Sequence, residues 1–255
     1  MNLILIHPSE LADPVLLSGP RAAHIHSVLK PAPGDLLKIG VVNGLCGKAQ
    51  VLATTPESAS LRVLNLDETP PAPWCNLILA LPRPRAMKRL WPQLATLGVR
   101  DIHLLNADKV EKTYFASHAT DPETYTPLLL DGLMQAGATA MPGVHIHPRF
   151  STFIEKTLPA LITPATLPLL AHPGPATDFQ PLSTSVDLCR EGSTEVDRGR
   201  PQPLLAVGPD GGWTPGEHAA FLAAGFHPFS LGERPLRTDM ACVALLATLH
   251  YLLNK

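Results

Sequence analysis

The sequence predicts an α/β protein: a mostly parallel sheet covered by helices on both faces, preceded by a small β-rich domain. The prediction rests first on a change of pattern along the chain. Residues 1–68 hold short strand patterns around one helix, whereas after residue 73 apolar strands alternate with helices, as in α/β folds. It rests second on composition: of the 255 residues, 45% are apolar and 16% are charged. The chain can therefore bury a real core and is not disordered.

The N-terminal domain is expected to span residues 1–70. Ser18, followed by Gly19-Pro20, marks the start of its helix, and Asn43-Gly44 predicts the turn of a hairpin. The expected strands are residues 2–6, 36–42, 47–54 and 60–66, and the expected helix is residues 21–30. The last strand closes a small sheet or barrel. Residues 69–73 contain three prolines, which stiffen the chain and remove backbone donors, so the domain boundary is placed there.

The second domain is expected to span residues 71–255. Its expected strands are residues 76–81, 99–105, 144–147, 167–171, 204–207 and 229–231. A helix over residues 87–94 contains Pro92, which predicts a kink or a break there. The last helix, from Asp239, is apolar almost all round and must be buried in the core or against another subunit. Residues 183–203 are polar and charged and are expected to form a long surface excursion.

Ligands of such sheets bind at the carboxyl ends of the strands, so we expect the site in the loops after Leu81, Val207 and Leu231. The loop after Val207 packs three glycines into five residues and opens a helix. Thr214 fits the N-cap of that helix, and Glu217 completes a capping box. The glycines allow positive φ angles and close approach of a ligand. The alternative is a tight turn that binds nothing.

Neither common nucleotide fingerprint occurs in these loops. The first loop lacks the Gly-Lys-Ser/Thr end of a P-loop, and G-x-G-x-x-G is absent, which disfavours an NTPase or a nicotinamide enzyme. The loop after Leu231 holds two arginines and two carboxylates within seven residues, and Thr238 is its expected N-cap. These charged side chains are Glu233, Arg234, Arg237 and Asp239. They either bind a ligand or include an Arg–Asp pair that fastens the start of the helix.

The composition disfavours several other classes of protein. The cysteines, at positions 46, 75, 189 and 242, form no C-x-x-C pair, so neither a zinc site nor a disulfide framework is expected and a reducing cytoplasm fits. His24-x-His26 and His145-x-His147 lack a third ligand at suitable spacing, so no metal is expected. No apolar run approaches the roughly 18 residues that span a bilayer, and the first residues form no secretory signal. We expect a cytoplasmic protein without a membrane partner.

Two motifs resemble those of a known family. Residues 208–217 (GPDGGWTPGE) and 231–241 (LGERPLRTDMA) are similar to the paired signature of the RsmE family, GPEGG…E and LG-x-RILR-x-ETA. Weaker similarity at residues 24–35, 97–99 and 135–137 extends the resemblance over essentially the whole chain. The members of this family are 16S rRNA uracil-N3 methyltransferases of the SPOUT superfamily.

The resemblance implies the organisation and the partners of the protein. Residues 1–70 would form a PUA-like, RNA-binding β-barrel, and residues 71–255 a SPOUT domain with a C-terminal trefoil knot. The protein would bind S-adenosylmethionine, form a homodimer and methylate N3 of a uridine in 16S rRNA. Its substrate would be ribosomal RNA, free or in the small ribosomal subunit.

Departures from the family pattern keep two alternatives open. Asp210 and Asp239 stand where glutamates are usual, Thr96 replaces another glutamate, and Ala138 and Ala140 stand where arginines are common. The first alternative is a SPOUT methyltransferase that acts on another RNA position. The second is a non-catalytic RNA-binding module that keeps the fold.

The resemblance also implies roles for individual residues. The N3–H of uracil is a poor nucleophile until its proton leaves, so the enzyme needs a cation beside the developing anion and a base. Arg237 is expected to be the cation, because its planar guanidinium can donate two bonds. Asp210, Glu233 and Asp239 are candidate bases or orienting residues. The expected cofactor-binding residues are Leu81, Val207, Gly208, Gly211, Gly212, Leu231, Gly232, Leu236, Arg237 and Thr238.

The RNA side of the expected site rests on local charge, because the net charge of the chain is only −2. Residues 83–112 hold seven basic and three acidic side chains, a local excess that can contact phosphates. The alternative is a solvated helix face. The expected RNA-binding residues are His26, Lys30, Arg83 and Arg85.

Overall fold

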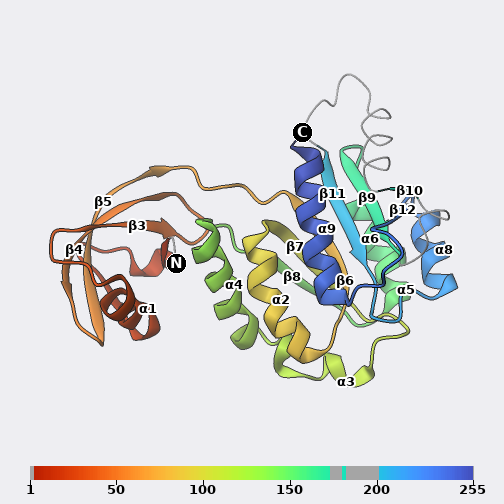
Figure 1. The fold of residues 1–255 in the computed structure, drawn as a ribbon, viewed down its shortest axis with the longest axis horizontal. Coiled ribbons are helices and arrows are strands. Elements are labelled where there is room, and N and C mark those ends of the chain that lie inside the picture. Colours follow the sequence, from red (N-terminus) through yellow and green to blue (C-terminus); the bar gives the residue numbers. More distant parts are fainter. Residues whose placement is uncertain (1–2, 173–179, 182–200, 255) are drawn as a thin grey trace. The chain divides into compact units, whose positions relative to one another are not determined.

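The structure, a computed structural model, describes residues 3–172, 180–181 and 201–254 (Figure 1). Two compact units divide the chain: Met1–Pro73 together with Leu129–Met141, and Trp74–Leu128 together with Pro142–Lys255. Most of the predicted surface excursion, residues 183–200, lies outside the described residues. Its last residues, Gln202 and Pro203, open a buried strand instead.

The first unit is built on a curled sheet of five strands in the order β1-β3-β4-β5-β2 (Figure 1). The strands are β1 (Ile4–Ile6), β2 (Val15–Ser18), β3 (Leu36–Val41), β4 (Cys46–Thr54) and β5 (Ser58–Glu68). The antiparallel pair β3–β4 confirms the predicted hairpin. Strand β2 is not among the predicted strands, because its four residues show only two buried positions, too short a pattern to read from the sequence.

One helix closes the core of the first unit. It begins as α1 (Gly19–His24) and continues as the π-helical turn η2 (Ile25–Leu29). A separate short 3-10 turn, η1 (Pro8–Glu10), lies earlier in the chain. Ala22 and Ile25 pack with buried strand residues such as Leu61. The predicted helix is therefore confirmed, and burial of its apolar side fixes it on the sheet.

The segment Leu129–Met141 belongs to the first unit although it lies far along the chain. Thr139 holds it to the β3–β4 turn: Asn43 N donates to Thr139 O at 2.8 Å, and Thr139 Oγ1 donates to Gly44 O at 2.6 Å. Gly40 is required beside it, because a Cβ there would lie 2.7 Å from Thr139 Cγ2. No local pattern in the sequence predicts this long-range packing.

The second unit is a parallel sheet of seven strands in the order β10-β12-β9-β11-β6-β7-β8. Its strands are β6 (Cys75–Ala80), β7 (Val99–Leu105), β8 (Gly143–His147), β9 (Thr166–Ala171), β10 (Gln180–Pro181), β11 (Gln202–Val207) and β12 (His227–Ser230). Leu77, Ile78 and Leu79 of the central strand β6 are all 0% exposed, so both faces of the sheet are covered. The predicted fold class is confirmed.

Helices connect the strands of this sheet, and α9 follows the last strand. They are α2 (Pro84–Thr96), α3 (Lys112–Phe115), η3 (His118–Thr120), α4 (Pro122–Ala136), α5 (Phe150–Thr152), η4 (Phe153–Thr157), α6 (Leu158–Leu161), α8 (Pro215–Ala223) and α9 (Thr238–Leu253). Figure 1 shows α2 and α9 side by side on one face of the sheet. In the described part of the chain, no helix is both long and apolar enough to cross a bilayer.

Of the kink or break predicted at Pro92, a break does not occur, because α2 runs through this residue as a single helix. A proline inside a helix removes one backbone hydrogen bond, and here the packing of the buried face outweighs that loss. Leu90, Trp91 and Leu94 are 0% exposed, and Trp91 Nε1 donates to Ala119 O at 2.9 Å. These contacts hold the helix in place on both sides of the proline.

The cysteines that the structure describes are buried in the core. Cys46, Cys75 and Cys242 are buried and free, and Cys189 lies outside the described residues. Burial raises the pKa of the Cys75 thiol to about 12, and burial also raises the pKa of Cys242. Both therefore stay protonated and unreactive at neutral pH.

Candidate functional site

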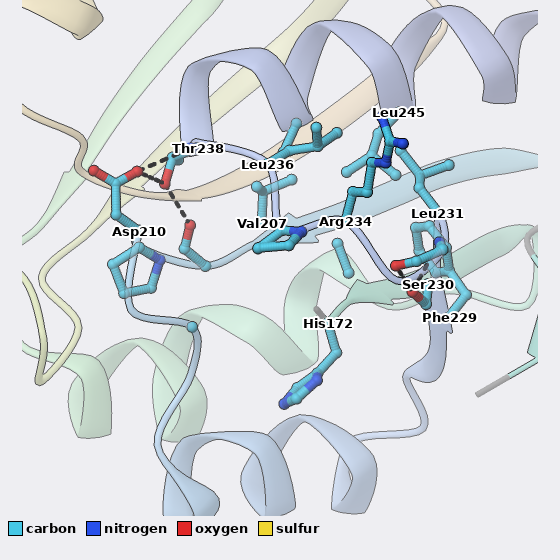
Figure 2. Close-up of a pocket in the computed structure, with 17 residues that line it drawn as sticks. His172, Val207, Asp210, Phe229, Ser230, Leu231, Arg234, Leu236, Thr238 and Leu245 are labelled. Carbon is cyan, nitrogen blue, oxygen red and sulfur yellow. Dashed lines mark hydrogen bonds between the residues drawn. The ribbon is translucent and has the colours of Figure 1, made fainter. Parts of the chain in front are cut away.

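A cavity of about 620 Å³, including its solvent-facing part, lies at the carboxyl ends of β9, β11 and β12 (Figure 2). The lining residues are Ala171, His172, Val207, Gly208, Pro209, Asp210, Gly212, Phe229, Ser230, Leu231, Gly232, Arg234, Pro235, Leu236, Thr238, Ala241 and Leu245. All of them belong to the second unit, so this unit alone forms the cavity.

The first wall is the glycine loop between β11 and α8. Thr214 caps α8 and accepts a hydrogen bond from Glu217 N at 3.3 Å, while the Glu217 carboxylate accepts from Thr214 N at 2.8 Å. The predicted capping box is therefore confirmed. Gly212 has a φ of +69°, a conformation that L side chains rarely adopt, and its N–H closes a turn onto Pro209 O at 2.7 Å.

The second wall is the loop between β12 and α9, and it is tied directly to the first. Asp210 Oδ1 accepts from the backbone N–H of Thr238 at 3.0 Å. The Thr238 hydroxyl lies 3.0 Å from the same oxygen and 3.1 Å from Gly208 O (Figure 2). The predicted N-cap at Thr238 is wrong by one residue, because Arg237 is the N-cap and Thr238 begins α9. The hydroxyl joins the two loops instead of capping the helix.

Figure 2 shows how the side chains are distributed along the cavity. Asp210 and Thr238 lie at one end, Ser230 and Leu231 lie at the other, and Val207 lies between them. Ser230 shapes its end, since its hydroxyl accepts from Gly232 N at 3.0 Å. The cavity therefore offers apolar side chains along its length, backbone groups in both glycine turns and one carboxylate.

A cluster of charged side chains lies beside the cavity at the start of α9. Asp239 Oδ2 accepts from Arg89 Nη2 at 3.0 Å, and Asp239 Oδ1 lies 3.7 Å from Arg237 Nε. Burial of Asp239 opposes its ionisation, but the hydrogen bond from Arg89 and the charge of Arg237 outweigh that effect and lower its pKa. The side chain of Arg237 is 62% exposed and does not line the cavity.

Seven of the ten residues predicted to bind a cofactor line the cavity: Val207, Gly208, Gly212, Leu231, Gly232, Leu236 and Thr238. The others, Leu81, Gly211 and Arg237, do not. Leu81 is 1% exposed, and its N–H donates to Leu105 O at 3.1 Å. The loop after Leu81 is therefore not a wall of this cavity.

Three polar side chains of the lining, His172, Ser230 and Arg234, are absent from the predicted cofactor-binding residues. The carboxyl-end rule applies equally to the strand over residues 167–171 and would have indicated His172. Its ring packs against the edge of His218 with ring centroids 4.9 Å apart. Burial and the neighbouring His172 lower the pKa of His218. Arg234 could not be distinguished from Arg237 by spacing alone.

The residues predicted to bind RNA fall into two groups. In the first unit, Lys30 is exposed, and His26 Nδ1 lies 3.3 Å from Thr54 Oγ1. In the second unit, Arg83 and Arg85 are exposed at the start of α2, and Arg83 Nε lies 3.9 Å from Asp210 Oδ2. Arg83 therefore borders the glycine loop.

Over residues 3–172, 180–181 and 201–254, no group of three or more His, Cys, Asp or Glu side chains is placed to hold a metal ion. His145, one of the paired histidines in the sequence, instead contacts Asp101 Oδ1 through Nε2 at 3.0 Å.

Two solved structures share this architecture. A Ribosomal RNA small subunit methyltransferase E from Neisseria gonorrhoeae bound to S-adenosyl methionine has a TM-score of 0.70 and 19% identity, over 99% of this chain and 98% of that one. A putative methyltransferase from Legionella pneumophila in complex with SAM has a TM-score of 0.71 and 22% identity, over 98% of both chains. This chain therefore has the fold of these two structures.

Sequence comparison identifies the family. Residues 70–250 match the family described as "RNA methyltransferase domain", and the chain belongs to this family, in its RsmE branch. Two relatives are named Ribosomal RNA small subunit methyltransferase E. That of Treponema pallidum is 28% identical over 98% of this chain and 92% of its own length. That of Synechocystis is 27% identical over 98% of this chain and 78% of its own length. The predicted resemblance is confirmed.

Proposed function

We propose that this protein transfers a methyl group from S-adenosylmethionine to N3 of a uridine in 16S rRNA. One observation carries the proposal: the two signature loops, residues 208–217 and 231–241, meet in space and form one cavity at the carboxyl ends of parallel strands. Asp210 and Thr238 join them. The names of the relatives, which describe rRNA methyltransferases, support the substrate class.

The residues of the cavity fit S-adenosylmethionine. Apolar side chains such as Leu236 and Leu245 suit the adenine ring, and the backbone of the turns at Gly208 and Gly232 can pair with its polar edge. The methionine part carries its ammonium and its carboxylate on one carbon, so it would pair with either the Asp210 carboxylate or the Arg234 guanidinium. When bound, this cofactor supplies a methyl group that its sulfonium already activates. The protein must then hold the accepting nitrogen in line with it.

Arg237 is proposed to stabilise the negative charge that develops on the uracil ring. It lies between the lining residues Leu236 and Thr238, and its exposed side chain can reach a base that approaches from solvent. Asp239 is proposed to orient Arg237. Its low pKa makes it a weak base, so the role of proton acceptor is left to Asp210 and Glu233.

The proposed RNA contacts involve both domains. Arg83, which is exposed beside the glycine loop, and Arg85, which is exposed two residues further along, would bind phosphates near the target uridine. The domain of residues 1–70, with His26 and Lys30, would hold a second part of the RNA. The domain of residues 71–255 would carry out the transfer. A ribosomal RNA substrate places this reaction in the cytoplasm.

The proposal includes a homodimer. Helix α9 is largely apolar. Two of its large side chains, Met240 and Tyr251, are nevertheless each 62% exposed. A groove between α2 and α9 is lined by Arg89, Gln93, Asp239, Met240 and Val243, and a second copy of the chain would cover it. Light scattering after size exclusion tests this part, and a mass near 27.3 kDa would contradict it.

Two measurements test the proposed reaction. Calorimetry with S-adenosylmethionine should show binding at one site per chain, and no binding would exclude catalysis. Nucleoside mass spectrometry of rRNA from a deletion strain should show the loss of 3-methyluridine. Loss of a different methylated nucleoside would instead support a methyltransferase acting on another position. An unchanged rRNA, together with no binding of the cofactor, would favour a non-catalytic RNA-binding module.

A further inference from the structure

The loop that follows β7 touches the glycine loop from outside the cavity. Lys109 Nζ donates a hydrogen bond to Gly211 O at 2.7 Å, across 102 positions of the sequence. Lys109 itself is exposed and does not line the cavity. Its contact is therefore with the back of the turn whose other side, at Gly208 and Gly212, lines the cavity.

The same loop is also fixed to the start of α8. Asp108 N donates to Glu217 Oε1 at 2.8 Å, and the Thr214 hydroxyl lies 3.4 Å from Asp108 Oδ2. Glu217 is 3% exposed, so this hydrogen bond is sheltered from water and strengthened accordingly. It places Lys109, the next residue, at a defined distance from the glycine loop.

A side chain at position 211 would meet Lys109 and no other residue within 4 Å. A Cβ on Gly211 would lie 3.1 Å from Lys109 Cδ and 3.9 Å from Lys109 Cβ. Gly211 is not among the glycines with positive φ, so its backbone would accept an alanine. By contrast, Gly212 is required by its φ, and a Cβ on Gly208 would lie 3.2 Å from the ring of Trp213.

We propose that Lys109 is a positioning residue for the cofactor: its ammonium and its aliphatic stem hold the Gly211 peptide, and so fix the turn over residues 208–212 in the form that receives S-adenosylmethionine. This inference rests on the function proposed above. An exposed lysine of a methyltransferase could instead bind an RNA phosphate, and the two roles differ in what they change. Positioning of the turn affects affinity for the cofactor without RNA, whereas a phosphate contact affects only RNA binding and its dependence on salt.

The first experiment measures the dissociation constant for S-adenosylmethionine by calorimetry without RNA, together with KM and kcat. Lys109→Met keeps the stem and removes the donor, and it should weaken cofactor binding about fivefold, as the loss of one hydrogen bond predicts. Its KM for the cofactor should rise by the same factor, with kcat within about twofold. Lys109→Arg keeps a donor and should recover most of the affinity. The matched control is Lys156→Met, an exposed lysine on η4, which should change nothing.

The second experiment tests the contact with Gly211. Gly211→Ala should displace the lysine stem and weaken cofactor binding about as much as Lys109→Ala does. The double variant should then be no weaker than either single variant, because both changes act on one contact. Urea denaturation of each variant checks that the fold is retained.

The outcomes separate this inference from the function on which it rests. If the wild-type protein does not bind S-adenosylmethionine, the proposed function fails. If the wild type binds but Lys109→Met binds equally well, the positioning role is wrong. A loss of RNA affinity with unchanged cofactor affinity would assign Lys109 to the phosphate contact. Additive effects of Lys109→Ala and Gly211→Ala would also overturn the inference.

Discussion

Acid should destabilise the second unit through one buried histidine. His103 of β7 is 4% exposed, and its Nδ1 lies 3.0 Å from His147 Nε2. The ring of His145 stacks on it with centroids 4.7 Å apart. Burial first, and then the charges of His145 and His147, lower the pKa of His103 from 6.5 to about 4, against the opposing effect of Asp101.

The sign of the effect follows from linkage. Because the pKa of His103 is lower in the folded state, protons bind preferentially to the unfolded chain and stability falls as the pH falls below the unfolded value. The difference between 6.5 and about 4 amounts to at most about 3.4 kcal/mol at 1.36 kcal/mol per pKa unit. About 2 kcal/mol of this is already lost at about pH 5, and almost none at about pH 7.5.

Urea denaturation followed by tryptophan fluorescence measures this loss. The three tryptophans, at positions 74, 91 and 213, all belong to the second unit, so the signal reports the unit that contains His103. His103→Gln should lose about 2 kcal/mol less than the wild type between about pH 7.5 and about pH 5. The control His118→Gln changes a ring that is 91% exposed and should behave as the wild type. Equal acid losses in His103→Gln and the wild type would refute the reasoning.

Three further predictions concern the site. Arg237→Ala should lower kcat at least about 100-fold, since the charge on the base is no longer stabilised, while calorimetry shows cofactor affinity within about twofold; near-normal turnover would exclude the role. Arg83→Gln and Arg85→Gln should each weaken RNA binding and reduce the slope of log K against log salt by about 1. Unchanged slopes would mean that these arginines lie on a solvated helix face and contact no phosphate. Gly212→Ala should destabilise the protein by about 1–2 kcal/mol, because its φ of +69° disfavours a side chain. Denaturant unfolding would contradict this prediction if stability were unchanged.

Local chemistry explains which features could be predicted from the sequence. Thr214 and Glu217 interact through hydrogen bonds within the first turn of α8, so their spacing alone defines the capping box. The parallel strands are short apolar runs bounded by loops, and their pattern is visible for the same reason. The packing of Thr139 on the β3–β4 turn depends on residues about 95 positions apart, and no local pattern encodes such a contact.

The candidate site was predictable as a pair of loops but not in its details. Whether Arg234 or Arg237 lines the cavity depends on the path of the chain between β12 and α9, which spacing does not fix. Thr238 was expected to satisfy its own helix, because local hydrogen bonds are the ones that a sequence pattern reveals. Its hydroxyl instead bonds 28 and 30 positions away, to Asp210 and Gly208.

Asp210 stands where the family usually has glutamate, and its contact with Thr238 explains why the shorter side chain is sufficient. Asp210 Oδ1 reaches both the N–H and the hydroxyl of Thr238 at 3.0 Å, so the short side chain is sufficient to satisfy an orphan donor in the first turn of α9. The negative charge near that helix start is favourable as well. The aspartate therefore makes the contact that joins the two loops. Since those loops form the cavity only when they are held together, the substitution favours a working cofactor site over a fold retained without catalysis.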